Sequence, residues 1–152
     1  MKENIIKILR TLFPFLSVIF LWRLNIPFWN PGGILAIIPI FFCTFIKPVS
    51  WFMPFGLIFC FLLDYNLGAP CYWTAIYCLC YALNGFQNFI DFRHRDFNSI
   101  DMFMIYIVLE LLFFVIDNLN WTTFGRALWL FVYMTLLYLP ITRLIDKVKN
   151  DR

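Results

Sequence analysis

The chain has 152 residues, of which 62% are hydrophobic and only 14% charged, and its mean hydropathy is +0.79. Ordinary soluble domains are about 45–50% apolar and about 25% charged, and a chain this short has too little interior to bury the excess. The composition therefore excludes an ordinary water-soluble domain and predicts a membrane protein. The net charge of +3 comes from basic residues scattered between apolar runs, without a nucleic-acid-binding motif, so nucleic acid is not an expected partner.

Six apolar segments are candidates for membrane-spanning helices. A helix needs roughly 20 apolar residues to cross a hydrocarbon core of about 30 Å, and fewer where long polar side chains anchor its ends. In chain order, the six ranges are about 5–22, 33–46, 49–64, 71–90, 100–116 and 124–145. We therefore expect an all-α, polytopic membrane protein in which residues 1–152 form a single six-helix transmembrane domain.

Prolines mark the first two segments and the connection between them. Pro14 predicts a kink in the first segment, and Pro39 interrupts the short second one. The connection "NIPFWNPGG" contains Pro27, Pro31 and a glycine pair, which favours a stiff, turn-rich loop over a helix. No small-x-small cleavage site follows the first segment, so we expect it to remain as an anchor.

The third segment ends with a carboxylate at a depth where lipid is expected. Counted at about 1.5 Å per residue from Lys47 at the inner boundary, Asp64 lies about 25 Å away, in the outer third of the span. Asn66 and Gly68 indicate a sharp turn directly after it. Asp64 either caps the next helix, binds a partner or ligand, or transfers a proton or ion. Arg23 and Arg126, on the same side of the membrane, are further candidate ion-pair partners for it.

The fourth segment carries small residues at the spacing of a helix contact. They are Ala75, Cys78, Ala82 and Gly85. A face of this kind lets another helix approach closely. It either packs within the bundle or accepts a single-span partner.

A second acid lies within the fifth segment. Glu110 follows Asp101 by about two and a half helical turns, which puts it near the bilayer midplane. Intramembrane carboxylates are rare and are functional candidates. The alternative is a structural, protonated Glu110 that is hydrogen-bonded to a tyrosine or a backbone carbonyl. Tyr77 and Tyr81 of the fourth segment lie at a similar depth.

The basic residues predict the orientation of the six segments. Loops rich in Lys and Arg are retained in the cytoplasm. With both termini on one side, that side carries Lys2, Lys7, Arg10, Lys47, Arg93, Arg95, Arg143, Lys147, Lys149 and Arg152, and the other side only Arg23 and Arg126. We therefore expect cytoplasmic N- and C-termini, with the polar stretch 91–101 as the main cytoplasmic loop.

Residues for catalysis are poorly represented. The chain has no nucleophile elbow and no phosphate-binding loop, and His94 is its single histidine. The five cysteines include no C-x-x-C pair, so they indicate neither a disulfide framework nor a zinc site. We expect a protein that is not an enzyme and holds neither a cofactor nor a metal.

Three features follow one another in the first part of the chain. They are a proline-rich external loop (Pro27, Pro31), a second segment closed by Lys47-Pro48, and a third segment ending in G-x7-D-x3-G (Gly56, Asp64, Gly68). This order resembles MreD, a family of rod-shape-determining proteins of the bacterial inner membrane, over about residues 10–90. Family members often carry a Gly and a small residue where this chain has Cys60 and Tyr72.

The resemblance implies a non-enzymatic scaffold that supports cell shape and peptidoglycan elongation. MreD-like proteins associate with the bitopic membrane protein MreC. Through it they associate with the MreB cytoskeleton, the RodA glycosyltransferase and a penicillin-binding transpeptidase. The family is also structurally akin to the substrate-binding subunits of energy-coupling-factor transporters. That kinship implies an alternative, a membrane subunit that binds a small solute with Asp64, Asn66, Trp73 and Glu110 in its pocket.

Overall fold

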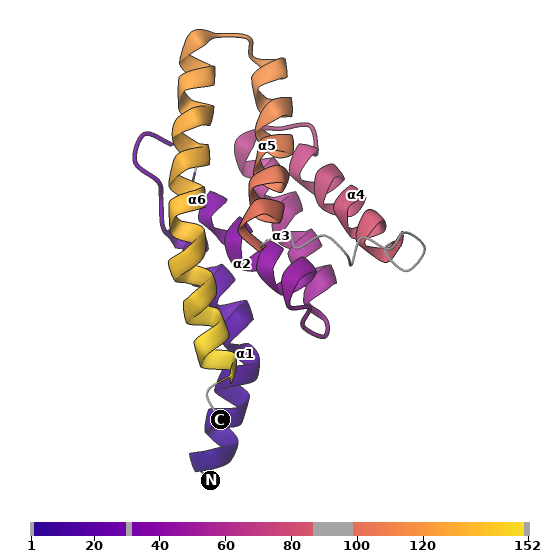
Figure 1. The fold of residues 1–152 in the computed structure, drawn as a ribbon, viewed down its shortest axis with the longest axis vertical. Coiled ribbons are helices and arrows are strands. Elements are labelled where there is room, and N and C mark those ends of the chain that lie inside the picture. Colours follow the sequence, from indigo (N-terminus) through magenta and orange to yellow (C-terminus); the bar gives the residue numbers. More distant parts are fainter. Residues whose placement is uncertain (1, 30–31, 87–98, 151–152) are drawn as a thin grey trace.

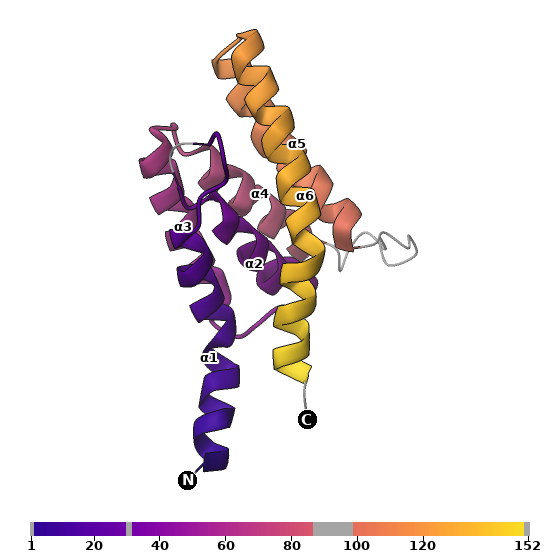
Figure 2. The same cartoon turned by 90° about the vertical axis from the view of Figure 1, so that its left-hand side faces the viewer.

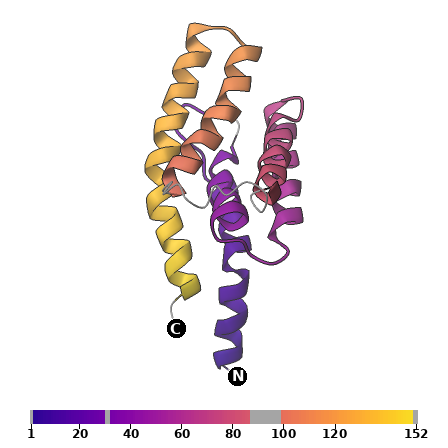
Figure 3. The same ribbon diagram turned by 45° about the vertical axis from the view of Figure 1, so that its right-hand side comes forward.

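The computed structural model describes residues 2–29, 32–86 and 99–150, and within them the chain is all-helical, without a strand. The elements are α1 (Lys2–Arg23), η1 (Ile34–Ala36), α2 (Ile37–Phe41), η2 (Phe42–Ile46), α3 (Phe52–Leu67), α4 (Tyr72–Phe86), α5 (Ser99–Asp117) and α6 (Trp121–Asn150) (Figure 1). The α5–α6 pair lies on one side and the α3–α4 pair on the other, with α2 between them (Figure 3).

Helix bounds differ from the predicted ranges by a few residues. The third range stops at 64, but α3 continues to Leu67, so Asp64 lies inside the last turns of a helix. The sixth range, 124–145, is extended in α6 at both ends. Residues 87–90 of the fourth range, Pro31, and residues 91–98 of the predicted cytoplasmic loop lie outside the described residues.

Three helices are long and apolar enough to cross a membrane: Asn4–Arg23, Ser99–Asp117 and Trp121–Lys149. In their most apolar stretches only 17%, 28% and 28% of the residues are buried within the molecule. So much uncovered apolar surface is suited to lipid rather than water, as expected for a membrane protein. The remaining apolar helices, at 34–46, 52–67 and 72–83, are shorter.

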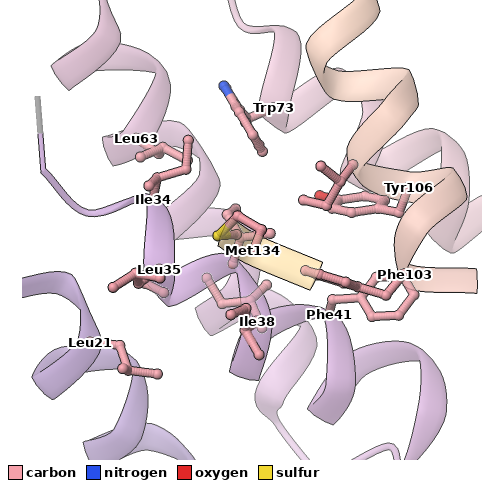
Figure 4. Packing of buried hydrophobic residues seen from close by; sticks show 14 of the residues in the cluster. Leu21, Ile34, Leu35, Ile38, Phe41, Leu63, Trp73, Phe103, Tyr106 and Met134 are labelled. Carbon is pink, nitrogen blue, oxygen red and sulfur yellow. The ribbon is translucent and has the colours of Figure 1, made fainter. Parts of the chain in front are cut away.

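The second predicted segment forms the centre of the bundle. Every residue from Gly33 to Thr44 is buried. Pro39 has no N–H to donate, and the segment changes from a 3₁₀ turn (η1) through α2 to a π-helical turn (η2), closed by Lys47 N–H donating to Phe42 O at 2.9 Å. Figure 4 shows side chains from the surrounding helices converging on it, including Leu21, Leu63, Trp73, Phe103, Tyr106 and Met134.

Both chain termini lie at the same end of the molecule (Figures 1 and 2). Towards this end Lys47, directly after η2, forms an ion pair with Asp146 of α6. Because both side chains are partly exposed, the pair contributes little to stability. It nevertheless links the central segment to the C-terminal turns of α6.

A glycine allows α3 to lie against α4. A Cβ atom on Gly56 would lie 2.5 Å from the Tyr77 hydroxyl oxygen and 3.3 Å from Ile40 Cγ2. The Tyr77 hydroxyl donates to Met53 O at 3.2 Å and lies 3.0 Å from the Thr44 hydroxyl oxygen. With its proton directed to Met53 O, Tyr77 accepts a hydrogen bond from Thr44. The ring is therefore held in place against Gly56, and α3, α4 and η2 meet at this point.

We predict that Gly56→Ala destabilises the protein by about 1–3 kcal/mol, because overpacking displaces a hydrogen-bonded ring. Gly125→Ala is the matched control, since a Cβ there meets nothing within 4 Å. Thermal unfolding in detergent measures both variants. Equal melting temperatures for the two would contradict the close approach.

Candidate functional site

Asp64 caps the helix that follows its own. Its Oδ1 accepts a hydrogen bond from the backbone N–H of Trp73 at 3.0 Å, and its Oδ2 accepts from the N–H of Thr74 at 2.9 Å. The Thr74 hydroxyl donates to the same Oδ2 at 2.6 Å. Trp73 and Thr74 are the second and third residues of α4, where helix N–H groups lack partners within the helix. The carboxylate also complements the positive end of the α4 dipole.

The turn between the two helices explains how Asp64 reaches α4. Gly68 ends α3 in the left-handed conformation, with φ of 63°. Gly68 N–H donates to Tyr65 O at 3.3 Å, and Ala69 N–H donates to Asp64 O at 3.0 Å, the hydrogen-bond pattern of a Schellman motif. A Cβ on Gly68 would meet nothing within 4 Å, so the glycine is needed for its conformation and not for space. We call residues 64–74 the α3–α4 corner.

The capping interpretation of Asp64 is confirmed. Only 2% of the residue is exposed, and neither Arg23 nor Arg126 forms an ion pair with it among the described residues. Of the two kinds of partner expected for Asp64, backbone donors and an arginine, the structure therefore shows the backbone donors. Backbone donors satisfy the acid because they lie one short turn away.

Two other site candidates lie on the surface. Asn66 is exposed on the last turn of α3, and Pro48 is exposed in the connection between η2 and α3. Pro31 lies outside the described residues. Asn66 therefore belongs to the exposed side of the α3–α4 corner, and Pro48 lies outside the corner.

The small residues of α4 face away from the rest of the molecule. Ala75, Cys78 and Ala82 are exposed, whereas Ile76 and Tyr77 are buried. Gly85 lies outside the residues whose exposure is described. The surface formed by Ala75, Cys78 and Ala82, which we call the small face of α4, is therefore left uncovered by residues 2–29, 32–86 and 99–150.

Glu110 differs from Asp64 in that no backbone N–H donates to it, and its neighbour among the described hydroxyl groups is Tyr106. Glu110 is 1% exposed, and neither of its carboxylate oxygens accepts or donates a hydrogen bond within the described part of the chain. Of the two tyrosines at a similar depth on α4, Tyr77 is engaged by Thr44 and Met53 instead. The tyrosine beside Glu110 is Tyr106 of its own helix. The hydroxyl of Tyr106, one turn before Glu110 on α5, is also buried without a hydrogen bond.

A small cavity lies beside Glu110 at the α3–α4 corner. Its volume is about 80 Å³, and it is lined by Leu67, Gly68, Ala69, Tyr72, Trp73, Glu110, Phe114, Asp117 and Asn118. Of the four residues expected in a solute pocket, the cavity brings Trp73 and Glu110 together and leaves out Asp64 and Asn66. A larger hollow of about 420 Å³ lies elsewhere, beside Asn25, Ile26, Phe28, Trp29 and Arg126.

Sequence reasoning missed three hydroxyl groups that shape this region. Thr74 completes the cap on Asp64, Thr44 joins η2 to Tyr77, and Tyr106 adjoins Glu110. Hydroxyls inside apolar helices require partners, so each was a detectable signal. Which group each hydroxyl lies beside depends on how the helices are rotated about their axes, and spacing along one helix does not provide that.

Comparison of the chain with protein-family models, curated proteins and solved structures gave no match in any of the three. The function is therefore argued from the residues of this chain.

We predict that Asp64→Ala destabilises the protein by about 2 kcal/mol, because it leaves the two α4 N–H groups and the Thr74 hydroxyl without their charged acceptor. Asp101→Ala is the control, since Asp101 is only half-buried in the first turn of α5. Urea or thermal unfolding in detergent measures both. An Asp64→Ala variant as stable as Asp101→Ala would show that the cap contributes nothing.

Proposed function

We propose that this protein is an MreD-like scaffold of the bacterial inner membrane. In this proposal its six helical segments all lie in the bilayer. The small face of α4 binds the transmembrane helix of a bitopic, MreC-like partner. The scaffold catalyses no reaction and supports cell shape by positioning peptidoglycan synthesis through that partner and its MreB-, RodA- and transpeptidase-type associates.

The observation that carries the proposal is an uncovered face of small residues on α4, a helix whose opposite face is fixed by contacts with α3. Asp64 fixes the start of α4, and Gly56 and Tyr77 hold its buried face against α3. In lipid, helices associate through close packing of small residues rather than through the hydrophobic effect. Ala75, Cys78 and Ala82 offer such a surface, and it faces outward.

Charge supports the orientation in this proposal. The two termini lie at one end of the molecule, where the C-terminal turns of α6 carry Lys147 and Lys149. Positively charged segments are retained in the cytoplasm, so we assign this end to the cytoplasmic side. The α3–α4 corner then faces the exterior.

The cavity that contains two of the four residues expected in a solute pocket is small, and the larger hollow of about 420 Å³ contains none of the four, which favours the scaffold over the solute-binding alternative. Pockets for drug-sized ligands usually have volumes of roughly 300–1,000 Å³. The cavity that contains Trp73 and Glu110 measures about 80 Å³. It is too small for a vitamin-sized solute, and the acid expected beside it, Asp64, is fully engaged in capping α4.

The orientation predicts which cysteines a membrane-impermeant maleimide reaches in spheroplasts. Cys71, exposed at the start of α4, is labelled when the other four cysteines are replaced by alanine. Lys147→Cys, in a background that also lacks Cys71, is labelled only after permeabilisation. Labelling of both sites in intact spheroplasts would contradict the proposed orientation.

Depletion with complementation tests the function. We predict that rod-shaped cells depleted of the protein become round, and that the wild-type chain restores their shape. Ala75→Leu/Ala82→Leu, which fills the small face of α4, fails to restore shape and loses the copurifying bitopic partner, because the partner helix is kept at a distance.

Gly125→Leu is the matched control and restores shape, because it adds the same side chain at an exposed position of α6 with open space around it. Immunoblotting verifies equal amounts of each variant in the membrane. Unchanged morphology on depletion would contradict the scaffold function. Full complementation by Ala75→Leu/Ala82→Leu would contradict the assignment of the small face.

A further inference from the structure

The cavity at the α3–α4 corner has a chemical character that the scaffold function does not use. Its volume of about 80 Å³ exceeds the roughly 30 Å³ that one water molecule occupies in the liquid. The end of α3 with the turn after it, the first residues of α4, the second half of α5 and the residue after α5 line it. There is room for a small head group.

Glu110 lines this cavity as a buried acid to which no backbone N–H donates. Only 1% of the residue is exposed, and both of its carboxylate oxygens lack a hydrogen bond that meets ordinary geometric criteria among the described residues. A buried carboxylate in that condition is costly unless a positive charge or a donor reaches it. The nearby N–H groups at the start of α4 are already used by Asp64. Within the fold, the Tyr106 hydroxyl is the donor that lies beside Glu110. The cavity is the route by which a donor from outside the chain can reach the carboxylate.

The rest of the lining favours a cation. Asp117 adds a second carboxylate, and the described residues that line the cavity include no Lys, Arg or His. Tyr72, Trp73 and Phe114 supply aromatic rings, whose faces attract cations. A carboxylate together with aromatic rings is the combination that recognises ammonium groups. An anionic head group would meet two acids here and no basic side chain.

We propose that this cavity binds a primary ammonium group, with Glu110 as its counter-ion and the aromatic rings of Tyr72, Trp73 and Phe114 around it. The ammonium supplies the N–H donors that the Glu110 oxygens lack. It comes from a free small amine or from the amino head group of a membrane lipid. This inference does not depend on the scaffold function. The cavity lies at the α3–α4 corner, whereas the proposed partner binds the small face of α4.

Methylammonium is the probe that tests the proposal. The full-length protein, purified in detergent and an amine-free phosphate buffer, is titrated with methylammonium chloride, with NaCl as the ionic-strength control. We expect a saturable rise in the melting temperature and a saturable change in tryptophan fluorescence. The fluorescence change is lost in Trp73→Phe, because that ring lines the cavity.

Glu110→Gln keeps the size of the side chain and removes its charge, and we expect it to weaken methylammonium binding at least tenfold. Asp101→Asn, on the same helix but outside the lining, is the control and binds as the wild type does. The proposal is overturned if the wild-type protein gives no saturable response, if NaCl produces an equal one, or if Glu110→Gln and wild type respond alike. The wild-type titration decides the question even where Glu110→Gln folds poorly.

The source of the ammonium group is determined in lipid nanodiscs. In phosphatidylethanolamine discs, a lipid head group in the cavity raises the methylammonium concentration needed for half-saturation relative to phosphatidylcholine discs. Equal midpoints in the two lipids assign the site to a free amine. Either result supports ammonium binding. Since cell shape is not measured, failure of this test is distinguishable from failure of the scaffold function.

Discussion

Every backbone N–H group in apolar surroundings needs an acceptor within the protein, and at the start of α4 that acceptor is Asp64. In water, solvent would satisfy the N–H groups of Trp73 and Thr74. Where the group is buried away from water, no solvent reaches it, and an unsatisfied N–H costs up to several kcal/mol. The start of α4, which forms one wall of the cavity, is therefore fixed by a carboxylate from the preceding helix.

The G-x7-D-x3-G spacing has a common physical purpose in this structure. Gly56 lets the Tyr77 ring approach α3, Asp64 caps α4, and Gly68 turns the chain so that the carboxylate points back at the next helix. Each residue acts on the α3–α4 pair, at a different position along α3. Removal of one leaves the other two in place, but the α4 axis then loses one of its fixed points.

The helices could be predicted from the sequence, because apolar length and proline or glycine punctuation determine them. The cap on α4 was one of the alternatives for Asp64, because Asp64 and the N–H groups of Trp73 and Thr74 are separated only by the short connection between α3 and α4. The Gly56–Tyr77 contact was not predicted, because it joins two helices and depends on how each is rotated about its axis. For the same reason Tyr77 was expected near Glu110, whereas the structure directs its hydroxyl to Thr44 and Met53.

The two buried acids of this chain illustrate how structural and ligand-binding carboxylates differ. Both are almost completely buried, yet Asp64 accepts three hydrogen bonds while Glu110 accepts none from the described residues. Burial costs are offset for Asp64 within the fold, so its presence requires no further explanation. Glu110 has no such compensation and lies beside a cavity lined with aromatic rings and a second acid. A group that the fold leaves unsatisfied, next to space that the fold leaves unfilled, points to a cation from outside the chain as its partner.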